Sequence, residues 1–237
     1  MSEANTKSQP SRLRKFWREW RGFVVFIICM FLFRSAIADW NQVPSSSMRP
    51  SILDGDRIVV DKMAYGIRVP FTLIRVWQWS HPNRGDIVTF PSPVDDELFV
   101  KRVVGIPGDE VQLNRNRLII NGHVATYTPI PEEEHAGFYV PEERTFRLFR
   151  EEILDSSRII MLARDARDPG YASFGPVTLG EDEYLMLGDN RDNSSDFRRI
   201  GVVTRDRIIG RAHAVAFSLD LNNYWLPRLD RMFNNLY

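Results

Sequence analysis

The chain has 237 residues, of which 43% are hydrophobic and 12% aromatic, so it can bury a core of ordinary size and is not a disordered protein. Its 31 basic and 31 acidic residues give a formal net charge of zero, which offers no global electrostatic basis for binding nucleic acid. The single cysteine, Cys29, excludes an intramolecular disulfide, and cysteine usage therefore does not indicate a redox compartment.

The N-terminal part predicts a membrane anchor. Residues 1–21 form a basic tail, and eleven uninterrupted apolar residues follow from Phe23 to Phe33. A membrane span needs about 20 residues, and the interfacial side chains of Trp20 and Trp40, with Arg34 snorkelling outward, extend this run to that length. We predict one transmembrane helix over 22–40, with the tail in the cytoplasm and the rest of the chain on the outer side of the membrane.

A cleaved signal peptide is the alternative for the same segment. It would combine the basic tail, the apolar run and Ala36-Ile37-Ala38 as its cleavage site. The length of the tail and the charge of Arg34 close to that site favour the uncleaved anchor. Under both interpretations the rest of the chain is exported, and sequencing the N-terminus of the mature protein distinguishes them.

Beyond residue 40 the pattern favours short strands. Strand-forming segments rich in β-branched and aromatic residues lie at 57–62, 86–90, 98–105, 183–187 and 207–219. Residues 110–127 are typical of a meander with turns at 114–116 and 121–122. We predict a mainly β fold with an antiparallel β core, whose first part, 41–112, and second part, 183–220, are separated by an inserted β-rich cap. The cap, 113–182, is charged and has some helical character.

Two further segments are candidates for contact with a membrane. Residues 69–79 are strongly apolar and contain two tryptophans, which suits either a membrane-facing loop or a buried strand. In the C-terminal segment, 221–237, apolar residues recur at helical spacing at Leu226, Leu229, Met232 and Phe233. This spacing suits a short interfacial helix or an ordinary docked helix.

Three consecutive serines, Ser45, Ser46 and Ser47, lie between two prolines that stiffen the backbone. A serine becomes a nucleophile only when an adjacent base takes its proton. None of the four histidines has the sequence context of a catalytic triad. The chain also lacks a zinc motif, and the acidic loop 189–196 lacks the glycine and glutamate of a calcium loop. We therefore expect neither a metal nor another cofactor.

Lysine is the base that remains, because arginine stays protonated in proteins. Only four of the 31 basic residues are lysines, and Lys62 and Lys101 are the two outside the tail. Lys101 lies among apolar residues of a predicted strand, where burial would lower the pKa of its amine. Lys62 follows Asp61, although strand alternation points that carboxylate to the other face. A solvated strand lysine is the alternative for either residue.

Three segments, "PSSSMRPSILDGDRIVVDKMAYG", "KRVVGIPGD" and "GDNRDNSSDFRRIG", follow the apolar run in this order. They closely resemble the three signature boxes of type I signal peptidases. The resemblance implies a membrane-anchored serine/lysine endopeptidase with a mainly antiparallel β fold. Such an enzyme removes signal peptides after Ala-x-Ala-like sites at the outer face of the cytoplasmic membrane. The implied partners are precursor proteins and the phospholipid membrane, with no nucleic acid and no metal, and the implied functional unit is a monomer.

The resemblance assigns roles by position within the boxes. Ser47 resembles the nucleophile and Lys101 the general base that activates it. Ser45 matches the side-chain donor to the oxyanion, which would act together with the backbone N–H of Ser47. Losing such a donor typically costs on the order of a hundredfold in rate.

The third box supplies supporting residues in the same way. Ser194 resembles the hydroxyl that orients the lysine amine, and Asp196 and Arg198 resemble the pair that braces this serine. Shallow apolar pockets for alanine-sized substrate residues are expected, with walls formed by Val43, Met48, Phe99 and Val100.

The sequence departs from the family pattern at three points. Ser46 replaces a residue that is commonly glycine, only one span is predicted where some members have two, and the cap lacks the cysteine pair of others. A self-cleaving serine/lysine repressor would need a DNA-binding helix-turn-helix and no span. A membrane-anchored, non-catalytic β binding module would leave the three boxes unexplained.

Overall fold

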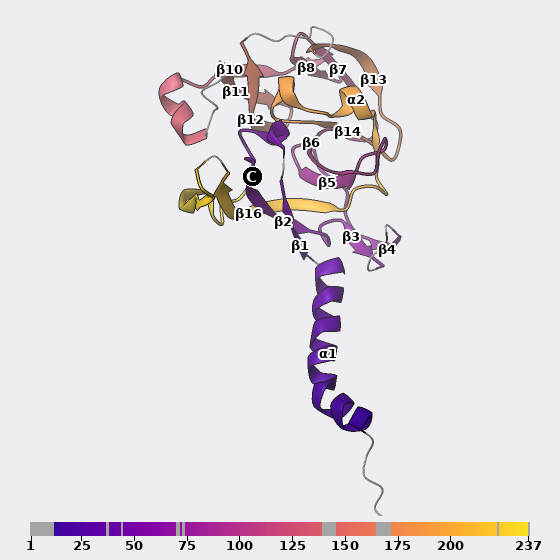
Figure 1. The fold of residues 1–237 in the computed structure, drawn as a ribbon. Coiled ribbons are helices and arrows are strands. Elements are labelled where there is room, and N and C mark those ends of the chain that lie inside the picture. Colours follow the sequence, from indigo (N-terminus) through magenta and orange to yellow (C-terminus); the bar gives the residue numbers. More distant parts are fainter. Residues whose placement is uncertain are drawn as a thin grey trace, which may run out of the picture.

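The computed structural model describes residues 12–36, 38–43, 45–69, 72, 74–138, 146–164, 172–221 and 223–236. Residues 1–11 of the predicted basic tail and Ile37 of the predicted anchor lie outside these ranges, as do parts of the predicted cap. One long helix, α1 (Arg12–Ala36), projects from a body made almost entirely of strands (Figure 1). The predicted mainly β class is confirmed.

Helix α1 exposes large apolar side chains, including Phe23, Val25 and Phe26. Among the described residues, no helix combines the length and the apolar character needed to cross a membrane. The helix also ends earlier than the predicted anchor, which was expected to reach residue 40. Ala38–Gln42 instead forms strand β1, whose backbone groups are paired with those of β2 (Asp56–Asp61).

The principal sheet brings together distant parts of the chain. Its order is β1-β2-β16-β5-β6-β14-β15, with β17 paired to β16, and its pairings are antiparallel as predicted. The remaining strands of this sheet are β5 (Ile87–Pro91), β6 (Leu98–Gly105), β14 (Glu183–Leu187), β15 (Val203–Thr204), β16 (Gly210–Asp220) and β17 (Leu226–Pro227). The strand predicted over 207–219 begins only at Gly210, because residues 204–208 form a turn closed by backbone hydrogen bonds.

The chain between β6 and β14 forms two smaller sheets. One has the order β13-β7-β8-β9 and the other β10-β11-β12. Their strands are β7 (Glu110–Asn114), β8 (Arg117–Ile120), β9 (His123–Val124), β10 (Thr126–Pro129), β11 (Phe146–Ile153), β12 (Ser156–Ala163) and β13 (Phe174–Thr178). The predicted turns are confirmed, since Asn116, Asn121 and Gly122 have positive φ angles of 61°, 51° and 78°.

The helical character expected in the cap is limited, among its described residues, to the 3₁₀ segment η2 (Glu132–Phe138). The charged stretch after it is a hairpin of β11 and β12. Phe146 and Leu148 in the first half of β11 are buried in one cluster with Met161, and Ile153 at its end is buried in another cluster. The predicted cap boundary at residue 113 falls within β7.

The cap and the principal sheet share one hydrophobic core. Val104 of β6 and Leu185 of β14 lie in the same buried cluster as Val111 and Leu113 of β7. This shared core means that the cap is packed onto the sheet that carries Lys101.

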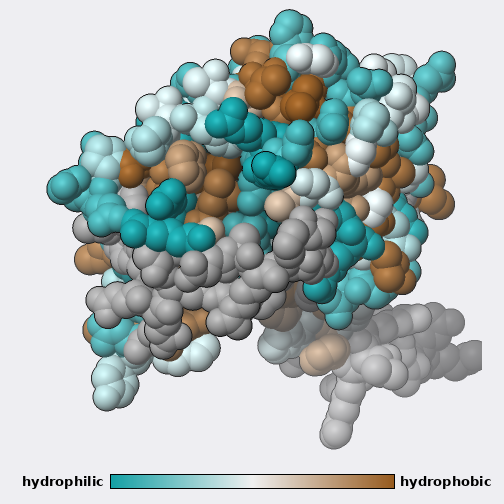
Figure 2. All heavy atoms as spheres, turned by 90° about the horizontal axis from the view of Figure 1, so that it is seen from above, coloured by the Kyte–Doolittle hydropathy of each residue, from teal (hydrophilic) through white to brown (hydrophobic). Residues whose placement is uncertain are grey.

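A two-stranded hairpin, β3 (Gly66–Arg68) and β4 (Arg75–Gln78), lies at the end of the β body from which α1 projects (Figure 1). Its apolar residues Ile74, Val76 and Trp77 are between 65% and 68% exposed. The described residues of 69–79 therefore do not form a buried strand. At the opposite end of the molecule, hydrophobic residues lie in separate patches among hydrophilic ones (Figure 2).

The prediction of a helix in the C-terminal segment is wrong. This segment contains the short strand β17 and one 3₁₀ turn, η5 (Leu229–Arg231). Its backbone is hydrogen-bonded to β16, since the N–H of Arg228 donates to Ser218 O and the N–H of Phe233 donates to Val215 O. These strand-type bonds use groups that a helix would have paired internally.

Candidate active site

Ser47 and Lys101, separated by 54 positions in the sequence, are in direct contact. Lys101 Nζ donates a hydrogen bond of 2.7 Å to Ser47 Oγ. The two residues are 6% and 4% exposed, respectively. Ser47 lies in the short 3₁₀ helix η1 (Ser46–Met48), and Lys101 lies in the middle of β6. The structure therefore brings together the two residues expected to act as nucleophile and base.

The surroundings of Lys101 favour a neutral amine. Burial lowers the pKa of Lys101 to about 8, against the opposing effect of the Asp196 and Asp189 carboxylates. The amine also donates to Val100 O at 3.0 Å and lies 5.0 Å from the centroid of the Phe99 ring. A lysine with this pKa is neutral in a substantial fraction of molecules near pH 8.

Ser45 lies next to the nucleophile. Its Oγ is 3.2 Å from Ser47 Oγ, and either hydroxyl can be the donor. Ser45 is exposed, whereas Ser47 is buried. A hydroxyl in this position is free to turn toward a group bound next to Ser47.

The predicted brace between Asp196 and Arg198 is present. The fully buried Asp196 carboxylate accepts hydrogen bonds from Arg198 Nε at 2.8 Å and from Arg198 Nη2 at 2.7 Å. It also accepts one from the N–H of Gly188 at 3.0 Å. Asp196 is the N-cap of the short helix α2 (Phe197–Ile200), which fixes its position at the end of the loop.

The expected contact between Ser194 and the lysine amine is absent. Ser194 is buried, and its hydroxyl has no hydrogen-bond partner among the described residues. The hydroxyl instead lies against the backbone of Gly188, where an added Cβ would be 2.2 Å from Ser194 Oγ. Ser194 is therefore adjacent to the loop that holds Ser47, but it does not hold Lys101.

Sequence reasoning missed three residues that join the loop 188–196 to the serine loop. The N–H of Asn190 donates to Ser47 O at 3.1 Å, and Asn193 Nδ2 donates to Ser46 Oγ at 2.7 Å. Gly188 has no room for a side chain, because a Cβ there would lie 2.5 Å from Ser47 O. The signal in the sequence was the glycine immediately after a buried strand, followed by two asparagines in a short loop.

A cavity of about 410 Å³ opens onto the two residues. Its lining includes Val43, Phe99 and Val100, which were expected as pocket walls, together with Ser45, Ser46, Ser47, Asp54, Glu97, Leu98, Lys101, Asn193 and Ser195. The fourth expected wall residue, Met48, is not part of the lining. It is fully buried and packs in the core with Ile52 and Ile58.

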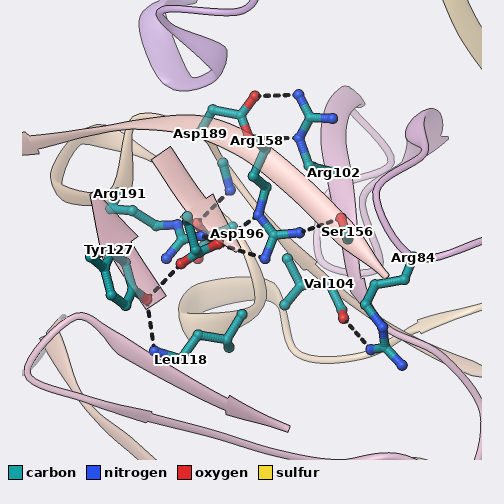
Figure 3. Close-up of polar contacts among 12 residues, drawn as sticks. Arg84, Arg102, Val104, Leu118, Tyr127, Ser156, Arg158, Asp189, Arg191 and Asp196 are labelled. Carbon is teal, nitrogen blue, oxygen red and sulfur yellow. Dashed lines mark hydrogen bonds and ion pairs between the residues drawn. The ribbon is translucent and has the colours of Figure 1, made fainter. Parts of the chain in front are cut away.

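A buried ionic network connects this region to the cap (Figure 3). Glu151 of β11 accepts hydrogen bonds of 2.6 Å from Arg158 Nε, Arg191 Nη2 and Tyr127 Oη. The guanidinium groups of Arg158 and Arg191 outweigh the effect of burial and hold the pKa of Glu151 at about 2. Burial, followed by the nearby Glu151 charge, raises the pKa of Tyr127.

A second buried ion pair involves Arg102, the residue that follows Lys101 in β6. Arg102 Nε and Nη2 contact the two carboxylate oxygens of Asp189 at 2.8 and 2.7 Å, and Ser51 Oγ donates to Asp189 at 2.6 Å. In the part of the chain that the structure describes, no three His, Cys, Asp or Glu side chains are grouped as ligands for a metal ion.

The family model described as "Signal peptidase, peptidase S26" matches residues 17–217 of this chain. The chain belongs to this family. The peptidase is 32% identical to signal peptidase I of Pseudomonas aeruginosa, over 84% of this chain and 71% of that one. It is 31% identical to signal peptidase I of Rickettsia massiliae, over 100% of this chain and 98% of that one.

The predictions of this family and of a serine endopeptidase are therefore confirmed. A solved structure of a signal peptidase I from Enterococcus faecalis matches the peptidase with 27% identity and a TM-score of 0.33. That match covers 56% of this chain and 97% of the other.

Proposed function

We propose that the peptidase removes N-terminal signal peptides from exported precursor proteins, with Ser47 as nucleophile and Lys101 as general base. The observation that carries the proposal is the buried hydrogen bond of 2.7 Å between Lys101 Nζ and Ser47 Oγ. A lysine can replace histidine as the base only when it is neutral, and the pKa of about 8 meets that requirement.

The proposed reaction begins when neutral Lys101 takes the proton of Ser47 as Oγ attacks the scissile carbonyl. The hydroxyl of Ser45 and the backbone N–H of Ser47 donate to the developing oxyanion. The Lys101 ammonium then gives its proton to the leaving amine, which leaves an acyl-enzyme on Ser47. A water activated by Lys101 resolves this ester. Asp196 and Arg198 brace the loop that lies against the serine.

The cavity is proposed to accept alanine-sized residues before the cut. Its wall includes the apolar side chains of Val43, Phe99 and Val100, which suit small apolar substrate residues. This favours cleavage after Ala-x-Ala-like sites. The functional unit is proposed to be a monomer.

We also propose that α1 anchors the peptidase in the cytoplasmic membrane with a single pass and a cytoplasmic N-terminus. The proposal is supported by the apolar run from Phe23 to Phe33 within α1, which follows the basic residues at the start of the helix. Ser47 follows Ala38 by nine residues, so it lies within about 30 Å of that point. The catalytic residues would then act close to the outer surface of the membrane.

The test is cleavage of a precursor that carries one Ala-x-Ala site by the purified full chain and its variants. Ser47→Ala and Lys101→Arg should each lower the rate by about a thousandfold or more, because arginine keeps the charge but cannot act as a base. Lys62→Arg is the matched control and should cleave at the wild-type rate. Near-normal cleavage by Lys101→Arg would reject the dyad, and a new N-terminus elsewhere than after the Ala-x-Ala site would reject the proposed specificity.

A further inference from the structure

Three arginines form a cluster at the hairpin of β3 and β4, away from the cavity. Arg68 and Arg75 lie opposite each other as partners in the register of the two strands. Arg205 comes from the turn after β15, and its backbone carbonyl accepts a hydrogen bond from Arg75 Nη2 at 3.5 Å. Arg68 Nη2 and Arg75 Nη2 both donate to the same acceptor, the carbonyl of Ile208. Arg68 and Arg75 therefore both lie against the turn that carries Arg205.

This cluster differs from the other buried arginines in having no carboxylate partner. Each of the others forms an ion pair of 2.8 Å or shorter with a buried carboxylate: Arg84, Arg102, Arg158, Arg191 and Arg198. Within the described residues, Arg68, Arg75 and Arg205 form no ion pair. They donate instead to main-chain carbonyls, such as Arg68 Nη2 to Asp206 O at 2.7 Å and Arg205 Nη2 to Ser80 O at 3.0 Å.

Several N–H donors of the cluster lack a hydrogen-bond acceptor among the described residues. Arg68 and Arg205 are 9% and 4% exposed. Arg68 Nη1, Arg75 Nε, and Arg205 Nε and Nη1 are shielded from solvent and have no hydrogen-bond partner among the described residues. Buried donors without partners are costly, and like charges held together add to that cost. Burial, together with the neighbouring guanidinium groups, lowers the pKa of Arg68 and of Arg205 to about 10.

We propose that Arg68, Arg75 and Arg205 bind the phosphate group of an anionic membrane phospholipid. The negatively charged oxygens of a phosphate can accept two hydrogen bonds from one guanidinium group. Guanidinium groups favour this bidentate pairing. A phosphate would offset the three positive charges together. The exposed carboxylates of Asp206 and Asp182 are the acidic groups that act on Arg68 and Arg205, and neither is in an ion pair with them in the described part of the chain.

The hairpin itself indicates the lipid source of the phosphate. Ile74, Val76, Trp77 and Trp79 flank or accompany Arg75 along the chain and are at least 50% exposed. Exposed tryptophans beside arginines are typical of the boundary between headgroups and acyl chains. The hairpin lies at the end of the β body from which α1 projects (Figure 1). The lipid source rests on the membrane anchoring proposed above, whereas the phosphate site does not.

The test is calorimetric titration of the full chain in a non-ionic detergent, without substrate, so that the outcome does not depend on the dyad. The probes are short-chain phosphatidylglycerol, short-chain phosphatidylcholine and inorganic phosphate at constant ionic strength. We expect phosphatidylglycerol to bind at least about tenfold more tightly than either of the others. Arg75→Gln should weaken this binding about tenfold, the loss expected for one charge-assisted hydrogen bond. Arg117→Gln, an exposed arginine of the cap, should leave it unchanged.

Arg75 is the residue to substitute because its hydrogen bonds to the carbonyls of Ile208 and Arg205 are long, at 3.2 and 3.5 Å, so the fold does not depend on them. If Arg75→Gln nevertheless fails to fold, Arg75→Lys is the second variant. It keeps the positive charge but loses the paired N–H donors of the guanidinium group, so it should weaken phosphatidylglycerol binding by a smaller factor. Equal phosphatidylglycerol binding by the Arg75 variant and the Arg117 control would overturn the site. Inorganic phosphate binding as tightly as phosphatidylglycerol would overturn the assignment to lipid.

Discussion

Glu151 of the cap and Arg191 of the loop before α2 form a buried ion pair, with Arg191 Nη2 2.6 Å from Glu151 Oε2. Arg191 begins the 3₁₀ turn η4 (Arg191–Asn193), and its carbonyl accepts a hydrogen bond of 2.6 Å from Arg198 Nη2. The N–H of Ala163 in β12 also donates to Asp192 in this turn at 2.8 Å. The cap therefore holds the loop that reaches the backbone of Ser47.

Glu151→Gln should destabilise the fold by about 3 to 5 kcal/mol, because it leaves two buried guanidinium groups without their shared carboxylate. The measurement is denaturant unfolding at neutral pH. Glu152→Gln is the matched control, since the neighbouring side chain is exposed and should change the free energy of unfolding by less than about 0.5 kcal/mol. Similar values for the two variants would contradict a stabilising role for the network.

The same carboxylate predicts a dependence of stability on pH. Its pKa of about 2 in the folded state lies below the ordinary value of 4.5, so its contribution is present above about pH 4.5 and is lost as the pH falls toward 2. Unfolding of the wild type should therefore become easier over this range by more than unfolding of Glu151→Gln does. If the free energy of unfolding fell with pH equally in the two proteins, a group other than Glu151 would be responsible for the loss of stability in acid.

The rate of cleavage should rise with pH until the Lys101 amine is neutral. With a pKa of about 8, log kcat/KM should increase by about one per pH unit below 8 and level off above it. Because the folded pKa is below the ordinary 10.5, stability should also improve as the pH rises from about 8 toward 10.5. A peptide substrate without titratable side chains isolates the enzyme's contribution, and a flat profile between pH 6 and 9 would contradict the assignment of Lys101 as base.

Gly188→Ala should inactivate the peptidase while Gly175→Ala does not. A Cβ at residue 188 would meet Ser194 Oγ at 2.2 Å and Ser47 O at 2.5 Å, so the serine loop must shift. A Cβ at residue 175 would meet nothing within 4 Å. We expect a loss of about a hundredfold in kcat for the first variant, measured on samples whose folding is checked by thermal unfolding. Full activity in Gly188→Ala would mean that the position of this loop does not matter for cleavage.

Ser46→Gly should be tolerated, although it removes the hydrogen bond from Asn193 Nδ2 to Ser46 Oγ. Ser46 is not among the described residues with positive φ, so its backbone does not need glycine. Stability should fall by about 1 to 2 kcal/mol, from the lost bond and the added freedom of the unfolded chain, and kcat should stay within about threefold. Ser46→Ala separates the two effects, because it removes only the bond.

The strands and the central pair of the site could be predicted because their signals are local. Enrichment in β-branched residues marked β2 and β6, and the scarcity of lysine left Lys62 and Lys101 as candidate bases. The spacing of Leu226, Leu229 and Phe233 was equally local and misled, because the partner of that segment is β16, which no short window contains. Backbone hydrogen bonds to β16 therefore outweighed the helical spacing of the apolar residues in this segment.

The supporting contacts of the site could not be predicted for a related reason. Glu151 and Arg191 are 40 positions apart, and one sequence does not show which of its many charges will meet in the interior. The same holds for Met48, whose apolar character fits a pocket wall and a core position equally well. Only packing decides between them, and it places Met48 in the core.

One residue separates the end of α1 at Ala36 from the start of β1 at Ala38. From there the chain is paired to β2 along its whole register, from Ala38 opposite Asp61 to Gln42 opposite Arg57. A flexible linker would let Ser47 sample a wide range of distances from the end of α1. A hydrogen-bonded strand instead keeps that distance nearly constant. With α1 embedded as proposed, the peptidase diffuses in the plane of the membrane while Ser47 stays at a constant distance from the membrane surface. The distance of the scissile bond of a precursor from that surface then becomes part of substrate selection.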